Sequence, residues 1–245
     1  MKNKHPKILA VITARAGSKG VVGKNYRDIC GKPLFLWSVL AALESKSIDL
    51  IAISSNCPII KSKSIPYLEK YSSRLIWIQR PDEYCDDLSI SEHALEHAYN
   101  YACLNHNYNA DYVALLQPTS PIRKKSLIDE AVSVVRKYSS CSLLTVSKHT
   151  PFFIQKKDDS VFWHYNRLDR PMRQSIPDDH FYYHDDGCLY LTSKDVLLNE
   201  QCRLSSNPYL FLNDEYSSMQ VDSEEGFVII ESVMKRILMS GLYVS

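Results

Sequence analysis

Several classes of protein are excluded by what this sequence lacks. No apolar run approaches the roughly 20 residues that a membrane-spanning helix needs, so no membrane partner is expected. The formal net charge is only +1 over 245 residues, which gives no general attraction for nucleic acids. The 7 cysteines are widely spaced and form no CxxC pair. This pattern is typical of reduced thiols, and we therefore expect a cytoplasmic protein.

Glycine is also scarce, and its distribution is uneven. The chain has 7 glycines, and four of them fall in the stretch from Gly17 to Gly31. A glycine-rich backbone with exposed N–H groups, interleaved with Arg15, Lys19 and Lys24, suits a polyphosphate, although spacing alone leaves a solvated surface turn open. The stretch is not a P-loop, because GxxxxGK[ST] would require glycine at position 18 and Ser or Thr at position 25.

Short apolar runs alternate with helical patterns along most of the chain. This rhythm predicts one α/β domain over residues 1–245, Rossmann-like, with a mainly parallel sheet covered by helices on both faces. The expected strands are Ile8–Ile12, Leu50–Ser54, Leu75–Ile78, Tyr112–Leu116, Ser142–Val146 and Leu189–Leu191. The expected helices begin near Leu34, Ser89, Ser126 and Glu224, and residues 58–71 form either a helix or an irregular crossover broken by Pro66.

Candidate site residues follow the predicted strands. Arg15 follows the first strand, Arg80 the third and Gln117 the fourth, while Asp222 follows a late run, Met219–Val221. Ligands of parallel α/β sheets bind beyond the carboxyl ends of the strands, so we expect these side chains to converge.

Two sequence blocks resemble a known family. ARAGSKGVVGKN with the following GKPL, and LLQPTSPIR, resemble the signatures of the acylneuraminate cytidylyltransferases, or CMP-sialic acid synthetases. The resemblance implies a fold of the nucleotide-diphospho-sugar transferase type. It also implies CTP and an acidic nine-carbon keto sugar as substrates. Lys24-Asn25 stands where enzymes for the eight-carbon sugar Kdo usually have Lys-Pro, which favours the sialic acid branch.

The resemblance also implies roles for individual residues. The catalytic set would be Arg15, Lys24, Gln117 and Asp222, with Arg15 and Lys24 on the triphosphate. Further CTP contacts would come from Ala14, Gly17, Ser18, Asn25, Arg80, Asp87 and Ser91. The sugar would be bound by Gln117, Thr119, Ser120, Arg173, Asp186 and Tyr190, with the Arg173 guanidinium on the sugar carboxylate.

The expected cofactor is Mg²⁺. Gln220-Val-Asp222 resembles the family's metal-binding D-x-D, so Asp222 would be the main ligand and Gln220 a neutral one. Asp222 could instead cap the last helix, because Asp222-Ser-Glu-Glu225 has the form of a capping box.

Residues 147–186 break the α/β rhythm. They are rich in aromatics, Pro, His and Asp, and Phe152–Gln155 with Val161–His164 reads as a hairpin. The segment resembles the family's dimerisation excursion, which reaches the partner subunit, so we expect a homodimer.

The predicted reaction is attack of the sugar hydroxyl on the α-phosphate of CTP, which gives a CMP-sugar and pyrophosphate. Gln220, and His184 where the family often has Arg, motivate an alternative, a non-catalytic nucleotide- or sugar-binding relative. Another acidic sugar such as Kdo is the second alternative, because Asp186 replaces the family's Asn and leaves sugar specificity open.

Overall fold

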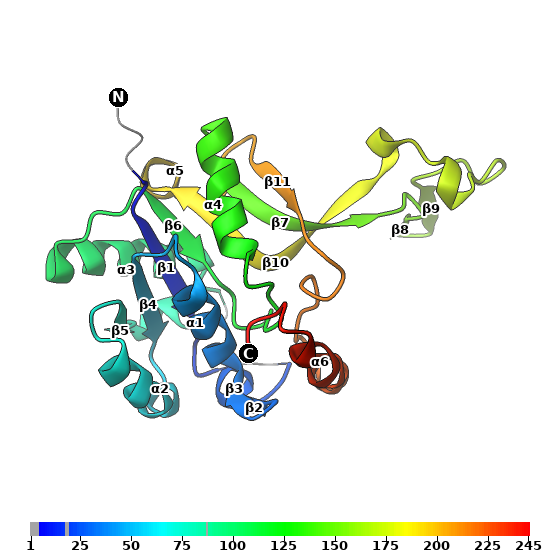
Figure 1. Cartoon of the computed structure of the whole chain (residues 1–245). Coiled ribbons are helices and arrows are strands. Elements are labelled where there is room, and N and C mark those ends of the chain that lie inside the picture. The colour runs from blue at the N-terminus through cyan, green and yellow to red at the C-terminus, as the bar shows by residue number, and fades with distance from the viewer. Residues whose placement is uncertain (1–4, 18–19, 87) are drawn as a thin grey trace.

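The fold is built on one seven-stranded sheet with the order β11-β7-β10-β6-β1-β4-β5 (Figure 1). The computed structural model describes residues 5–17, 20–86 and 88–245. The strands of the sheet are β1 (Ile8–Thr13), β4 (Leu50–Ser55), β5 (Leu75–Gln79), β6 (Tyr112–Leu115), β7 (Ser142–His149), β10 (Tyr182–Ser193) and β11 (Tyr209–Leu212). Two small hairpins pair β2 (Asp28–Ile29) with β3 (Lys32–Pro33), and β8 (Ile154–Lys157) with β9 (Ser160–Trp163).

Most neighbouring strands of the sheet run parallel. β6, β1, β4 and β5 form a parallel block, and β11 is parallel to β7. β10 is antiparallel to both of its neighbours, β6 and β7. The predicted mainly parallel α/β sheet is confirmed, whereas β11 was not predicted, although its four residues form a short apolar run.

Helices cover both faces of the sheet, as predicted. On one face, α1 (Leu34–Glu44), α2 (Pro58–Lys70) and α4 (Leu127–Tyr138) share an apolar cluster with the alternate residues Ile8, Ala10 and Ile12 of β1. On the other face, α3 (Ser91–His106) and α5 (Lys194–Asn199) share a second cluster with Leu9 and Val11. Both faces of β1 are therefore buried, which explains its unbroken apolar sequence.

A third apolar cluster lies at the end of the molecule that carries the glycine-rich loop. α6 (Glu224–Ile237) buries Phe227, Ile230 and Met234 there, against Trp37 of α1. Short 3₁₀ turns occupy Lys24–Tyr26, Asp82–Tyr84, Arg173–Ser175, Asp178–His180 and Leu238–Ser240. Within the described ranges, no helix is both long and apolar enough to cross a membrane.

Three local predictions are settled by the structure. α2 continues through Pro66 as a helix, so the irregular crossover is excluded. α3 begins at Ser91 and not at Ser89, because the Ser89 hydroxyl bonds the Glu83 carbonyl at 2.7 Å and Asp86 Oδ1 at 2.6 Å. Residues 219–221 are not a strand; Val221 N instead donates a single hydrogen bond to the Thr119 carbonyl at 2.8 Å.

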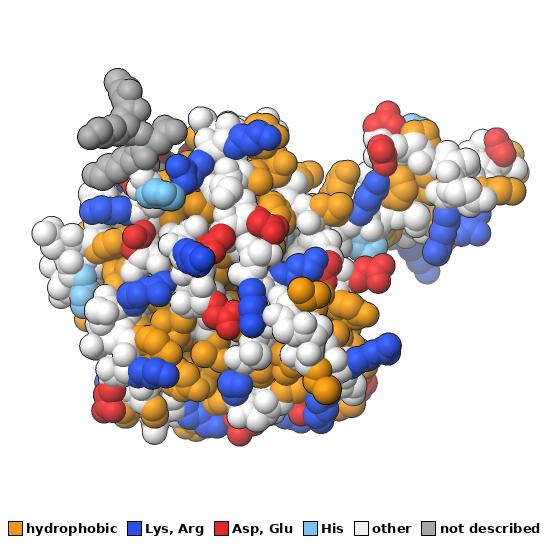
Figure 2. Space-filling view, viewed as in Figure 1, with side chains coloured by type: hydrophobic (Ala, Val, Ile, Leu, Met, Phe, Trp, Pro, Cys, Tyr) orange, Lys and Arg blue, Asp and Glu red, His pale blue; other side chains and the backbone are white. Residues whose placement is uncertain are grey.

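The segment that breaks the α/β rhythm forms a projecting arm. β7 and β10 extend beyond the body of the sheet as a paired ribbon, with His149 opposite Tyr182, and residues 150–181 lie at its end (Figure 1). The predicted hairpin is confirmed as β8–β9, with Asp158 in the left-handed conformation at its turn (φ 53°). The arm stands clear of the globular body in Figure 2.

Candidate active site

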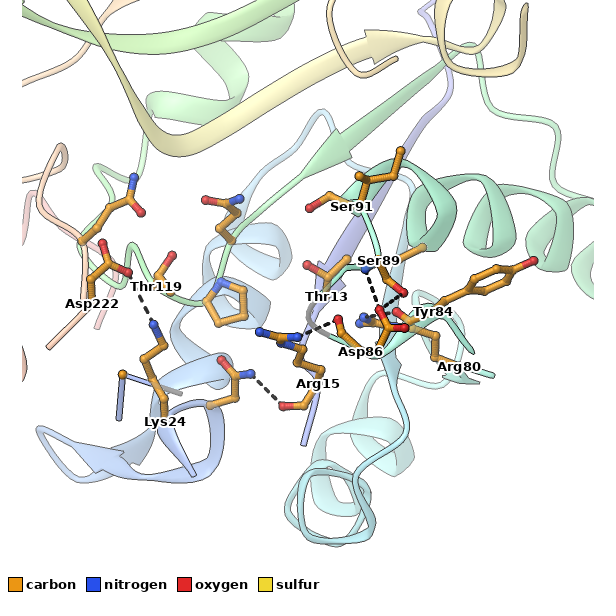
Figure 3. A pocket seen from close by; sticks show the side chains of 17 residues that line it. Thr13, Arg15, Lys24, Arg80, Tyr84, Asp86, Ser89, Ser91, Thr119 and Asp222 are labelled. Atoms are coloured by element: carbon orange, nitrogen blue, oxygen red, sulfur yellow. Dashed lines mark hydrogen bonds and ion pairs between the residues drawn. The ribbon is translucent and has the colours of Figure 1, made fainter. Parts of the chain in front are cut away.

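A cavity of about 500 Å³ opens at the carboxyl edge of the parallel strands (Figure 3). Lys24 and Asp222 lie at one end, Arg80 and Tyr84 lie at the other, and Arg15 lies between them. The full lining is Thr13, Arg15, Gly20, Lys24, Asn25, Arg80, Tyr84, Asp86, Ser89, Ile90, Ser91, Ala94, Gln117, Pro118, Thr119, Gln220 and Asp222.

Lys24 joins the glycine-rich loop to the segment before α6. Its Nζ donates to the Val221 carbonyl at 2.7 Å and lies 3.4 Å from Asp222 Oδ1. The Lys24 side chain is 13% exposed and that of Asp222 is 72% exposed. Gly20 lies so close to the Asp222 carbonyl that a Cβ would overlap it, so glycine is required at this crossing. Lys24 and Asp222 therefore bring a cation and a carboxylate together at this end of the cavity.

Asp222 is not the cap of α6. Ser223 is the N-cap, and its hydroxyl accepts a hydrogen bond from Gly226 N at 3.0 Å. The capping alternative for Asp222 is therefore wrong, because the neighbouring serine already performs that role.

Arg15 connects the loop to the opposite wall of the cavity. One terminal nitrogen donates to the Asp86 carbonyl at 2.7 Å, and the Arg15 carbonyl accepts from Asn25 Nδ2 at 2.9 Å. Asp86 in turn orders its own turn, since Oδ1 accepts from the backbone N–H groups of Leu88 and Ser89 at 3.0 and 2.6 Å. The Asp86 carbonyl thus binds the guanidinium of Arg15 in the middle of the pocket, and Asn25 binds the backbone of Arg15.

Arg80 is a buried cation in the far wall. Its Nε donates to Ser54 Oγ at 3.0 Å, and a terminal nitrogen donates to the Ser54 carbonyl. Burial lowers the pKa of this guanidinium. The Arg80 side chain points inward to Ser54 rather than outward to the neighbouring carboxylates of Asp82 and Glu83.

Two glutamines meet at the turn in β10. Gln220 Nε2 donates to the Asp186 carbonyl. Gly187 has φ 67°, and a side chain there would overlap the amides of both Gln117 and Gln220. A glycine at 187 therefore lets both amides approach the strand next to the cavity.

Of the residues predicted from the sequence, the cavity brings together Arg15, Lys24, Asn25, Arg80, Ser91, Gln117, Thr119, Gln220 and Asp222. Ala14 is buried behind the lining, Gly17 is exposed outside it, and Ser18 and Asp87 lie outside the described residues.

The remaining predicted sugar contacts do not line this cavity. Ser120 is fully buried, and Arg173 is exposed on the arm. Asp186 is buried and accepts from Thr145 Oγ1 at 2.6 Å. The Tyr190 hydroxyl donates to Asp185 Oδ1 at 2.7 Å, and burial raises the pKa of Tyr190 above its ordinary value.

Sequence reasoning missed several lining residues. Tyr84 lies against the rings of His93 and His97, with centroids 5.6 and 5.9 Å away. Asp86 and Ser89 form the turn beside it. The sequence marks Tyr84 only as an aromatic residue among acidic ones, and spacing alone does not distinguish such a residue from one on the surface.

The order of the strands and the helices on both faces define a fold of the nucleotide-diphospho-sugar transferase type. A solved CMP:2-keto-3-deoxy-manno-octonic acid synthetase complexed with CTP superimposes with a TM-score of 0.63 over 94% of this chain and 99% of that chain. The two sequences are 16% identical, so this likeness shows the fold alone.

Comparison with known sequences indicates which enzymes the chain resembles. The family described as "Cytidylyltransferase" matches residues 9–63, from β1 into α2. The CMP-N,N'-diacetyllegionaminic acid synthase of Legionella pneumophila is 28% identical over 94% of this chain and 97% of its own length. The N-acylneuraminate cytidylyltransferase of Escherichia coli is 27% identical over 94% of this chain, which spans 52% of that relative. The chain is therefore similar to sialic-acid-type cytidylyltransferases along most of its length.

Proposed function

We propose that this protein is a CTP-dependent cytidylyltransferase that activates an acidic nine-carbon keto sugar. The observation that carries the proposal is the convergence of Arg15, Lys24 and the buried Arg80 on one cavity. Its relatives carry the names of synthases and cytidylyltransferases for such sugars. The Kdo synthetase shares only the fold, so it does not favour the eight-carbon alternative.

The order of the side chains suits a nucleotide. Arg80 and Ser91 in the far wall offer donors to the cytosine, and Arg15 in the middle is placed for the triphosphate. Lys24 and Asp222 then lie at the reacting end, beside Gln117 and Gln220. The nucleotide would therefore run from the Arg80 wall to the Lys24 end.

The reaction breaks one bond to the α-phosphorus and makes another. A hydroxyl oxygen of the sugar bonds to the α-phosphorus of CTP, and the bond from that phosphorus to the α–β bridging oxygen breaks. Pyrophosphate leaves with the electron pair, and the hydroxyl proton passes to solvent. Fixed cations at Arg15 and Lys24 neutralise the phosphate charge, so positioning and electrostatics supply the rate.

Mg²⁺ fits the donors at the reacting end. Asp222 offers one exposed carboxylate, and Gln220 offers an amide oxygen because its nitrogen is already bonded to the Asp186 carbonyl. Among the described residues, no group of three or more His, Cys, Asp or Glu side chains could hold a metal. This suits Mg²⁺, which uses one or two carboxylates together with substrate phosphates and water, and which would neutralise phosphate charge when bound.

We also propose a homodimer that forms through residues 147–186. The arm exposes Phe153, Phe162 and Trp163, which together form more apolar surface than an isolated arm normally leaves in water. Arg173 also lies on the arm and does not line the cavity of its own chain, so its guanidinium would serve the cavity of a second copy. Light scattering at micromolar concentration tests this, and a monomer would rule it out. The seven free thiols favour a reducing compartment, the cytoplasm.

The decisive experiment measures pyrophosphate release with CTP and a panel of acids. The panel contains N-acetylneuraminic, legionaminic and pseudaminic acids, with Kdo as the eight-carbon competitor. We expect turnover with one nine-carbon acid and identification of its CMP-sugar by mass spectrometry. Calorimetric binding of CTP without turnover of any acid would favour the non-catalytic relative instead.

A further inference from the structure

Arg123 carries a charge that is almost completely removed from water. Its side chain is 1% exposed, and a buried ion costs several kcal/mol unless its donors are satisfied. Nε and one terminal nitrogen donate to the Cys188 carbonyl at 3.2 and 2.9 Å. The same terminal nitrogen reaches the Gln117 carbonyl at 2.7 Å, and the other donates to Ser38 Oγ at 2.9 Å.

This cation has no direct ion pair among the described residues. Burial lowers the pKa of Arg123, while the buried carboxylate of Asp186 acts in the opposite direction. The direct partners of the guanidinium are thus two backbone carbonyls and one hydroxyl. Stability alone does not explain such an arrangement, since an apolar side chain of similar volume would avoid the desolvation cost.

Both carbonyls belong to the framework of the cavity. The Gln117 side chain lines the cavity, and its carbonyl accepts a second bond from Ser38 Oγ at 3.1 Å. Cys188 directly follows Gly187, which lies against the amides of Gln117 and Gln220. One guanidinium therefore ties α1, the segment after β6 and the turn in β10 together.

We propose that Arg123 is a positioning residue that holds the side chains of Gln117 and Gln220 in the cavity by fixing the carbonyls of Gln117 and Cys188. Arg123 itself does not line the cavity. Other contacts hold the side chains of Arg15, Lys24 and Arg80. Arg123 should therefore affect binding and reaction of the sugar more than the affinity for the nucleotide.

Ser38→Ala is the mildest test, because it removes one partner of Arg123 and leaves the buried charge in place. We expect kcat/KM for the sugar to fall about tenfold, the scale of one hydrogen bond to a charged group, while the Kd for CTP changes less than about twofold. Arg123→Met should lower kcat/KM for the sugar about a hundredfold or more. Arg123→Lys, which keeps the charge, should lower it less. Ser64→Ala is the matched control, because Ser64 is equally buried and its hydroxyl bonds only the Ile60 carbonyl of its own helix at 2.7 Å.

A double-mutant cycle tests whether the effect acts through Gln117. In a Gln117→Ala background, Ser38→Ala should cause little further loss, because the side chain that it positions is already gone. The proposal would be overturned if Ser38→Ala lowered kcat/KM by the same factor with and without Gln117→Ala. It would also be overturned if Ser38→Ala lowered the affinity for CTP as much as kcat/KM for the sugar.

The kinetic part rests on the proposed function, so a second readout must not depend on turnover. The side-chain amide NMR signals of Gln117 and Gln220 should shift in Ser38→Ala and stay unchanged in Ser64→Ala. If the wild-type protein turns over no acid but these signals respond, the proposed function fails and the positioning role stands. Unmoved signals in Ser38→Ala refute the positioning role itself.

Discussion

Lys24→Met tests the polyphosphate site most directly. The substitution keeps most of the apolar stem and removes the ammonium. Two unit charges 4 Å apart interact by about 1 kcal/mol in water and about 4 kcal/mol at an effective dielectric constant of 20. The Lys24 side chain is 13% exposed, so its environment lies between these limits. A loss of about 2–3 kcal/mol lowers kcat/KM for CTP by about 30- to 150-fold.

Folding should change much less than activity. The variant loses one hydrogen bond to the Val221 carbonyl and a 3.4 Å pairing with Asp222. Asp222 is 72% exposed and hydrates readily, so the free energy of unfolding should fall by only about 1 kcal/mol. For a chain of this size, that corresponds to a Tm lower by about 2–4 °C.

The assay follows pyrophosphate release at varied CTP, together with a thermal melt of each variant. Lys63→Met is the matched control, because Lys63 also pairs with an exposed carboxylate, Asp28, at 3.1 Å but does not line the cavity. A Lys24→Met enzyme within about threefold of wild type would refute the phosphate assignment, and so would an equal loss in Lys63→Met.

The remaining predictions concern the walls and the reacting end. Asp222→Asn should nearly abolish turnover and leave Tm almost unchanged. Ser223→Ala should instead lower the free energy of unfolding by about 1 kcal/mol and leave the Mg²⁺ requirement unchanged. Activity and thermal melts, both measured against Mg²⁺ concentration, distinguish the two variants. Arg80→Lys should raise KM for CTP about tenfold or more, because Lys cannot reproduce the two-point contact with Ser54, and the CTP-to-UTP turnover ratio reports the loss. Gln220→Glu should lower kcat, because it places a carboxylate next to the Asp186 carbonyl, which accepts a hydrogen bond from the Gln220 amide. Gln220→Met removes the same donor without adding a charge, so comparison of the two variants separates these effects.

The central sheet could be predicted because burial on both faces leaves a plain sequence signal. β1, β4 and β6 are covered by helices on each side, so each appears as a continuous apolar run. β11 is an edge strand with Leu210 and Leu212 exposed, and its apolar run of four residues was not recognised as a strand.

Helix starts were predicted to within two residues, but the capping bonds were not, because tertiary contacts compete for the same polar groups. Ser126 is the N-cap of α4, but its side chain makes no capping bond. Asp129, three residues after Ser126, accepts from Ser45 Oγ at 2.6 Å and from Ser47 N at 2.9 Å. These bonds hold Asp129 against the end of α1. Burial acts to raise the pKa of Asp129, but the hydrogen bonds outweigh it and lower that pKa.

Side-chain direction at the turn in β10 was also beyond a sequence argument. The pairing of β10 with β7 is irregular between Asp185 and Tyr190, so the alternation of faces along the strand cannot be counted through it. Asp185 is exposed and accepts the Tyr190 hydroxyl, whereas Asp186 is buried. The sequence therefore did not indicate the direction of either carboxylate.

The buried position explains why an aspartate stands at 186 in this chain. Three donors surround its carboxylate: Thr145 Oγ1 at 2.6 Å, Cys188 N at 3.0 Å and Asn213 Nδ2 at 3.1 Å. An asparagine would bring two N–H donors of its own into this donor-rich site, whereas a carboxylate only accepts. The same negative charge also favours the charged form of the buried Arg123. The departure from asparagine at 186 thus matches the donors behind the cavity wall, and it changes no side chain that lines the cavity.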